Sequence, residues 1–144
     1  MIFSTKYRKP YLADGWRDDL FAYIGGIVKD HKSTLLKAGG IDDHIHLLLR
    51  IATEFAISKT VQLLKTSSSK WINEQRKIPK KFQWQSGYGV FSVSQSMAEK
   101  IKEYIAKQRE HHRKQTFEKE CVGFLNKHGI EYDPSYVFEM EIVA

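Results

Sequence analysis

Residues 42–51 constrain the fold more than any other stretch of this sequence, because two histidines interrupt an apolar strand pattern. Alternate residues of a β-strand point to the same face, so His44 and His46 would present two imidazoles side by side. The intervening apolar residues would face the opposite side: Ile45, Leu47 and Leu49. Two neutral imidazoles on one rigid strand are half of a metal site. Alone, the pair suits a half-exposed strand equally well, so the metal interpretation needs support from elsewhere in the chain.

The length of 144 residues suits one ordinary domain and is too short for two, so we expect residues 1–144 to form a single unit. A hydrophobic fraction of 42% is typical of globular proteins. No apolar run approaches the roughly 18 residues that cross a bilayer. The first residues also lack the charged start and apolar stretch of a secretory signal. We therefore expect a cytoplasmic protein with no membrane partner.

The charge balance favours a polyanionic partner. Lysine and arginine number 23 against 17 acidic residues, which gives a net charge of +6. Cys121 is the only cysteine, so an internal disulfide and a Cys-x-x-Cys metal or redox site are both excluded. Its spacing from Phe117 and Phe124 on a helical pattern predicts a buried thiol and not a nucleophile.

Apolar periodicity predicts the order of helices and strands. Helical spacing is found over residues 13–31, 58–75, 97–114 and 116–127, the last ending at a C′ glycine, Gly129. Strand patterns cover residues 2–5, 33–38, 44–51 and 90–93, with a turn or bulge at Gly39 and Gly40. The resulting βαββαβ order predicts an α+β ferredoxin-like sandwich with an antiparallel sheet, followed by C-terminal helices. Helices would cover one face of the sheet and leave the other for the histidine pair.

The support for a metal site comes from the predicted helix over residues 97–114. Tyr104 and Gln108 are four residues apart, so they would share one helix face. Gln108 can offer its carbonyl oxygen as a third metal ligand, and Tyr104 a phenol that attacks an electrophile bound at the metal. Breaking a phosphodiester without water needs a protein nucleophile, a Lewis acid on the phosphate and in-line placement. These residues therefore point to phosphoryl transfer.

Five segments together carry a resemblance that spans nearly the whole chain. They are FSTKYR at 3–8, DHIHLL at 43–48, KTSSSKW at 65–71, WQSGYGVFSVS at 84–94 and YIAKQREHHR at 104–113. In this order and spacing they resemble the single-tyrosine transposases of the HUH endonuclease superfamily, encoded by bacterial and archaeal insertion sequences and including REP-associated tyrosine transposases. The chain departs from that family in having almost nothing ahead of the first segment.

The resemblance implies a metal-dependent transposase. His44, His46 and Gln108 would hold Mg²⁺ or Mn²⁺, and Tyr104, the catalytic residue, would cut single-stranded DNA. The products would be a 5′-phosphotyrosine and a free 3′-OH, which the enzyme rejoins. The resemblance also implies recognition of a hairpin near the element end. It further implies a homodimer in which the tyrosine helix of one subunit can complete the metal site of the other.

Several basic, polar and aromatic residues are candidates for contacting DNA phosphates or bases. They are Lys6, Arg8, Lys65, Ser67, Lys70, Trp84 and Arg109. A charged helix face is more often simply solvated, and Trp84 suits the core as well as a stacking surface.

Three alternatives remain open. A domesticated relative would process chromosomal hairpins with the same chemistry, and the DNA flanking the gene would distinguish it. A protein that binds hairpins without cleaving them would keep the fold and the basic surface, an alternative motivated by the abrupt start of the chain. A structural zinc domain would need stoichiometric Zn²⁺, for which two histidines and one glutamine are a poor ligand set.

Overall fold

A computed structural model describes residues 1–111 and 115–131 of the chain. The first half of the described chain contains β1 (Ile2–Ser4), the 3-10 turn η1 (Lys6–Arg8), α1 (Asp14–Asp30), β2 (Thr34–Gly40) and β3 (His44–Arg50). The second half contains α2 (Ile57–Glu74), the 3-10 turn η2 (Gln95–Met97), α3 (Ala98–Ala106), α4 (Gln108–His111) and α5 (Phe117–Lys127). The expected α+β ferredoxin-like architecture is confirmed by this arrangement.

The sheet is antiparallel with the order β1-β3-β2, so the strand that carries the histidine pair lies at its centre. His46 of β3 lies opposite Ile2 of β1 on one side and Gly39 of β2 on the other. A central strand is fixed on both edges by backbone hydrogen bonds, which makes it the most rigid platform that this sheet offers.

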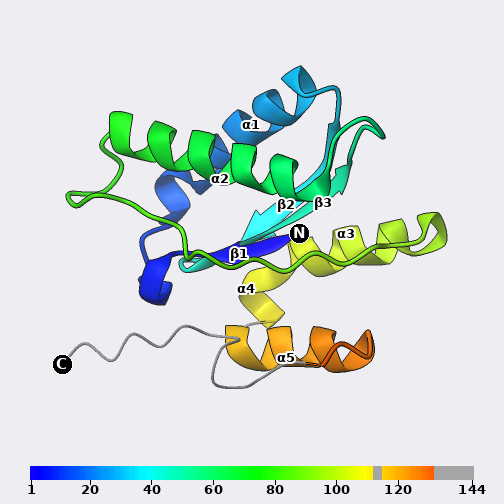
Figure 1. Cartoon of the computed structure of the whole chain (residues 1–144). Coiled ribbons are helices and arrows are strands. Elements are labelled where there is room, and N and C mark those ends of the chain that lie inside the picture. The colour runs from blue at the N-terminus through cyan, green and yellow to red at the C-terminus, as the bar shows by residue number, and fades with distance from the viewer. Residues whose placement is uncertain (112–114, 132–144) are drawn as a thin grey trace.

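Helices lie on both faces of the sheet (Figure 1). α1 and α2 pack on one face, and α3 and α4 lie on the other, with α5 beyond them. Side chains of β3 alternate between the two faces of the sheet, and Ile45 and Leu47 belong to the main core on the side of α1 and α2. That core also contains Phe3, Leu12, Trp16, Leu20, Ile24, Val28, Leu64, Ile72, Phe82 and Trp84. His44 and His46 point the opposite way, toward the layer formed by α3, α4 and α5.

The prediction of a fourth strand at residues 90–93 is wrong, since these residues form no strand. The segment beside β1 comes slightly earlier and makes only two isolated bridges, Ile2 with Gly89 and Thr5 with Trp84. Between those bridges the later segment has two residues more than β1, so a regular ladder cannot form. The segment nevertheless occupies the edge position that the sandwich requires.

The expected long helix over residues 97–114 is interrupted. Lys107 leaves helical geometry with φ −100° and ψ 23°, so Tyr104 ends up in α3 and Gln108 begins α4. Residues 112–114 of that predicted helix lie outside the described residues. Gly39 and Gly40, expected in a turn, are the last two residues of β2.

The last described helix agrees with its prediction. Thr116 caps α5, its Oγ1 accepting a hydrogen bond from the backbone N–H of Lys119 at 3.3 Å. Gly129 follows the helix with φ +65°, a left-handed conformation that glycine adopts without penalty. α5 therefore has a defined start and end.

Candidate metal centre

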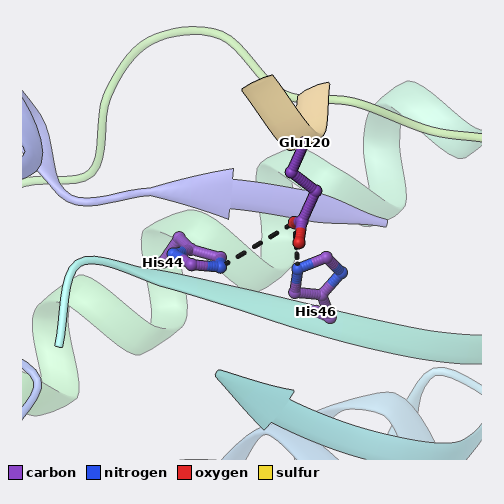
Figure 2. Close-up of side chains that lie close together, drawn as sticks. All are labelled: His44, His46 and Glu120. Carbon is purple, nitrogen blue, oxygen red and sulfur yellow. Dashed lines mark ion pairs between the residues drawn. The ribbon is translucent and has the colours of Figure 1, made fainter. Parts of the chain in front are cut away.

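The two histidines of β3 are almost completely enclosed. His44 is 0% and His46 3% exposed, and their rings lie 5.2 Å apart between centroids in an edge-on arrangement. Figure 2 shows both imidazoles rising from the same strand toward a third side chain, Glu120. Burial lowers the pKa of His46 to about 4, although the nearby Glu120 carboxylate acts to raise it. His46 is therefore a neutral imidazole at pH 7, the form that binds metals.

Partners on both ring nitrogens orient His44. Its Nδ1 lies 2.7 Å from Asp43 Oδ1, and its Nε2 lies 3.2 Å from Gln108 Oε1. A proton on Nδ1 satisfies the Asp43 carboxylate and leaves a lone pair on Nε2 that faces the Gln108 carbonyl oxygen. A carboxylate behind a histidine in this way is the usual outer support of a metal ligand.

Gln108 is 1% exposed and reaches the histidines from the start of α4. Its amide Nε2 donates to the backbone oxygen of Tyr104 at 3.2 Å, which turns its carbonyl oxygen toward His44. The convergence expected from the spacing of Tyr104 and Gln108 thus occurs across a break between two short helices and not along one continuous helix face.

Tyr104 lies in the last turn of α3 with its ring 5.8 Å from the His46 ring. Its hydroxyl donates to Glu120 Oε2 at 2.5 Å. Burial, and next the hydrogen bond and negative charge of Glu120, raise the pKa of Tyr104 well above its ordinary value. In this arrangement the phenol is protonated at neutral pH.

Glu120 of α5 is the functional candidate that the sequence analysis missed. It is 3% exposed, and its Oε1 lies 2.7 Å from His46 Nε2 and 3.9 Å from His44 Nε2 (Figure 2). The available signal was an acidic residue between Phe117 and Phe124 on the apolar face of an amphipathic helix. A carboxylate at such a position is buried only with a partner.

The donor set fits a divalent cation. Ligand atoms of His44, His46 and Glu120 lie within 4.8 Å of one another, and the Gln108 oxygen adjoins His44. Within residues 1–111 and 115–131, His46 Nε2 makes no hydrogen bond of standard geometry, although Glu120 Oε1 is 2.7 Å away. A cation beside these two atoms would satisfy both of them. Two imidazole nitrogens with a carboxylate and an amide oxygen form a mixed donor set of the kind that holds divalent metal ions.

A hollow of about 530 Å³ adjoins this centre, and His46 and Tyr104 are among its lining residues. Its other walls are mainly apolar and include Leu48, Phe91 and Ile101. Tyr104 and the edge of the histidine pair are therefore next to open space, even though the histidines are almost fully buried.

The predicted DNA-binding residues are divided among several places. Lys6, Lys65 and Trp84 line one polar cleft of about 350 Å³. Lys65 donates to the backbone oxygens of Gln85 and Gly87, so it stabilises the segment that forms one wall of the cleft. The indole of Trp84 is 8% exposed, stands edge-on to Phe3 and Phe82, and donates to Ser68 Oγ.

The remaining basic candidates have acidic neighbours. Arg8 pairs with Glu118 at 2.6 Å, Arg109 with Asp14, and Lys70 approaches Glu74 at 3.8 Å. Ser67 is half-buried on α2. The structure therefore brings the metal and tyrosine candidates together, whereas it does not gather these basic residues into one site.

Two further expectations concern the thiol and the membrane. Cys121 is partly exposed and not fully buried as predicted, and partial burial raises the pKa of its thiol to about 12. Among the described helices, none has both the length and the apolar character to span a bilayer.

Comparison with known proteins agrees with this geometry. Residues 1–108 match the family model described as "Transposase IS200 like". Two curated relatives, transposases for insertion sequence element IS200 from Salmonella typhimurium and Salmonella typhi, are each 30% identical over 115 residues. These alignments cover 76% of this chain and 75% of each relative.

A solved structure shares the fold. It is a crystal structure from Deinococcus radiodurans R1 assigned as a transposase, with 28% sequence identity and a TM-score of 0.59. The match covers 74% of this chain and 86% of that one. Fold and sequence together define a transposase. The chain belongs to the IS200-like transposase family, whose members are expected to bind DNA.

Proposed function

We propose that this transposase nicks and rejoins single-stranded DNA at hairpin-bearing element ends, using Tyr104 as its nucleophile. The observation that carries the proposal is the convergence of the Tyr104 hydroxyl with a buried donor set on and beside the central strand. Three of those donors are His44, His46 and Gln108.

The reaction is an in-line displacement at phosphorus. The Tyr104 oxygen forms a bond to phosphorus while the bond to the 3′ oxygen breaks, which leaves a 5′-phosphotyrosine and a 3′-OH. The phenol gives up its proton, and the departing 3′ oxygen gains one. Rejoining reverses these steps with a new 3′-OH. When bound, Mg²⁺ or Mn²⁺ would polarise a non-bridging phosphate oxygen.

The chain's own residues prepare this step. Asp43 holds the His44 ring, and Gln108 is tied to the backbone of Tyr104, so ligand and nucleophile move together. Burial and Glu120 raise the pKa of Tyr104, so the phenol is protonated before it reacts, and a nearby cation would favour loss of that proton.

For DNA contact we propose Lys6, Arg8, Ser67, Lys70 and Arg109, with Lys65 and Trp84 shaping the cleft that Lys6 lines. We also propose that residues 1–144 act as one cytoplasmic domain and that two copies form a homodimer. In that dimer the tyrosine helix would serve either its own or the partner's metal centre.

The test is a covalent adduct. A labelled hairpin oligonucleotide incubated with the protein and Mg²⁺ or Mn²⁺ should give a species that survives a denaturing gel. Tyr104→Phe should abolish this adduct, whereas Tyr88→Phe, which alters an exposed tyrosine, should retain it. An adduct formed by the Tyr104→Phe protein would show that the nucleophile is another residue.

Two other outcomes would identify the alternatives. Salt-sensitive hairpin binding without any adduct in either metal would indicate a protein that binds hairpins and does not cleave them. Cleavage of a hairpin absent from the DNA flanking the gene would indicate a domesticated relative.

A further inference from the structure

Glu120 contacts both halves of the proposed chemistry through its two oxygens. Oε1 lies 2.7 Å from His46 Nε2 and 3.9 Å from His44 Nε2, while Oε2 accepts the Tyr104 hydroxyl at 2.5 Å. In Figure 2 the carboxylate enters from α5 and points between the two imidazoles. One side chain therefore connects the metal-binding donors to the nucleophile.

The position of Glu120 is fixed by packing contacts of α5 before and after this residue. Phe117 stacks on the His44 ring with centroids 4.5 Å apart, and Phe124 packs edge-on against Tyr104 at 5.9 Å. Phe91 stacks on Phe124 at 5.4 Å from the segment that follows the sheet edge. Contacts one turn before and one turn after Glu120 thus set its depth in the site.

Three separations between donor atoms are compatible with one cation shell. Neighbouring ligands around an octahedral Mg²⁺ or Mn²⁺ lie about 3 Å apart, and opposite ones about 4 Å. The observed separations are 2.7 Å for His46 with Glu120, 3.2 Å for His44 with Gln108 and 3.9 Å for His44 with Glu120. A carboxylate also supplies negative charge, which two imidazoles and an amide lack.

We infer that Glu120 is a protein ligand of the metal ion and that its second oxygen positions the Tyr104 hydroxyl beside that ion. This inference rests on the proposed function. It adds a carboxylate to a donor set otherwise made of His44, His46 and Gln108, and it gives α5 a part in the active site. The nucleophile is then held by a ligand before DNA arrives, which lowers the entropy cost of the attack.

A different role would give opposite results. If the Glu120 carboxylate only occupied the place of the DNA phosphate, α5 would block the site. Removing the charge would then leave metal affinity unchanged and would speed cleavage. The experiment separates the two roles.

Mn²⁺ affinity of the full-length chain without DNA is the primary measurement, by calorimetry and by the electron paramagnetic resonance of free Mn²⁺. Glu120→Gln keeps the size of the side chain and an acceptor for Tyr104, so the fold should be preserved, which circular dichroism checks. We expect its Kd for Mn²⁺ to rise at least about tenfold. Glu118→Gln, on the same helix and paired with Arg8, is the control and should stay within about twofold.

A Glu120→Gln protein that binds Mn²⁺ within twofold of the unaltered chain, or more tightly, would overturn the inference. So would Glu120→Asp failing to bind Mn²⁺ more tightly than Glu120→Gln, since the shorter carboxylate keeps the charge. Should Glu120→Gln prove unfolded, the Kd for Mn²⁺ of Glu120→Asp is compared with that of the unaltered chain, and equal values would overturn the inference.

Adduct formation gives the second measurement. Excess Mn²⁺ should restore part of the adduct yield of Glu120→Gln, because mass action offsets weaker binding. Tyr104→Phe should instead bind Mn²⁺ normally and form no adduct at any concentration. A higher adduct yield from Glu120→Gln would contradict the inference. Absence of adduct from the unaltered chain would contradict the proposed function alone, since Mn²⁺ affinity is measured independently.

Discussion

Gly39 of β2 lies so close to α3 that a Cβ on it would stand 2.3 Å from the backbone oxygen of Ile105. Real Cβ atoms do not approach backbone that closely, so only glycine lets the helix lie on the strand here. Ile105 directly follows Tyr104. The close approach therefore determines how near the proposed nucleophile comes to the histidine pair.

Gly39→Ala should destabilise the protein by about 1–3 kcal/mol, because backbone must move to admit the methyl group. It should also reduce adduct formation, since α3 carries Tyr104. Urea denaturation measures the first effect and the hairpin assay the second. The matched control is Gly26→Ala in α1. A Cβ there would meet nothing within 4 Å outside its own helix, so the free energy of unfolding should rise by up to about 1 kcal/mol. Equal stability of the two variants would contradict the argument.

Ser68→Ala should cost about 1–3 kcal/mol, because it leaves the buried Trp84 indole N–H without its acceptor. Ser68 is 0% exposed, so water cannot easily replace the hydroxyl. Ser69→Ala, which removes only a local bond to the Thr66 backbone, should change the free energy of unfolding by less than about 0.5 kcal/mol. Similar values for both variants would mean that the indole finds another partner.

Mn²⁺ should raise the melting temperature of the unaltered chain, because a ligand that binds only the folded state adds about 2.7 kcal/mol at a hundred times its Kd. His46→Gln should lose most of this increase. His31→Gln is the control, since His31 stacks on Phe55 away from the metal donors. Thermal denaturation with and without Mn²⁺ makes the comparison, and an undiminished increase in His46→Gln would exclude His46 as a ligand.

Lys6→Gln should weaken hairpin binding and make it less sensitive to salt. Each phosphate neutralised by a lysine adds about 0.7–0.9 to the slope of log affinity against log salt, so the slope should fall by that amount. Lys102→Gln is the control, because Lys102 pairs with Glu99 on α3. Titrations at several KCl concentrations measure the slopes. An unchanged slope in Lys6→Gln would show that Lys6 does not contact a phosphate.

The periodicity of apolar residues correctly predicted the elements whose bounds depend on local sequence. The two-residue period places His44 and His46 on one face of β3, and helical periodicity gives α1, α2 and α5 within a residue or two of their bounds. The expected strand at residues 90–93 failed because pairing with β1 depends on a register that no local pattern encodes.

Long-range packing determined the features of the site that the sequence did not predict. Glu120 is 76 residues from His44, and it reaches the site only because Phe117 and Phe124 dock α5 on the rings of His44 and Tyr104. The spacing of Tyr104 and Gln108 predicted their convergence correctly but assumed a continuous helix. The helix breaks at Lys107, just before Gln108 contacts His44, and no local sequence pattern indicates that break.

The uneven pairing between β1 and the segment from Trp84 to Gly89 bears on how two chains can associate. Bulged edges turn their backbone groups out of line and so discourage another chain from adding a strand there. Among the described residues, β2 forms the opposite border of the sheet. An assembly that extends the sheet from one molecule into the next would therefore join more readily through β2 than through the bulged edge.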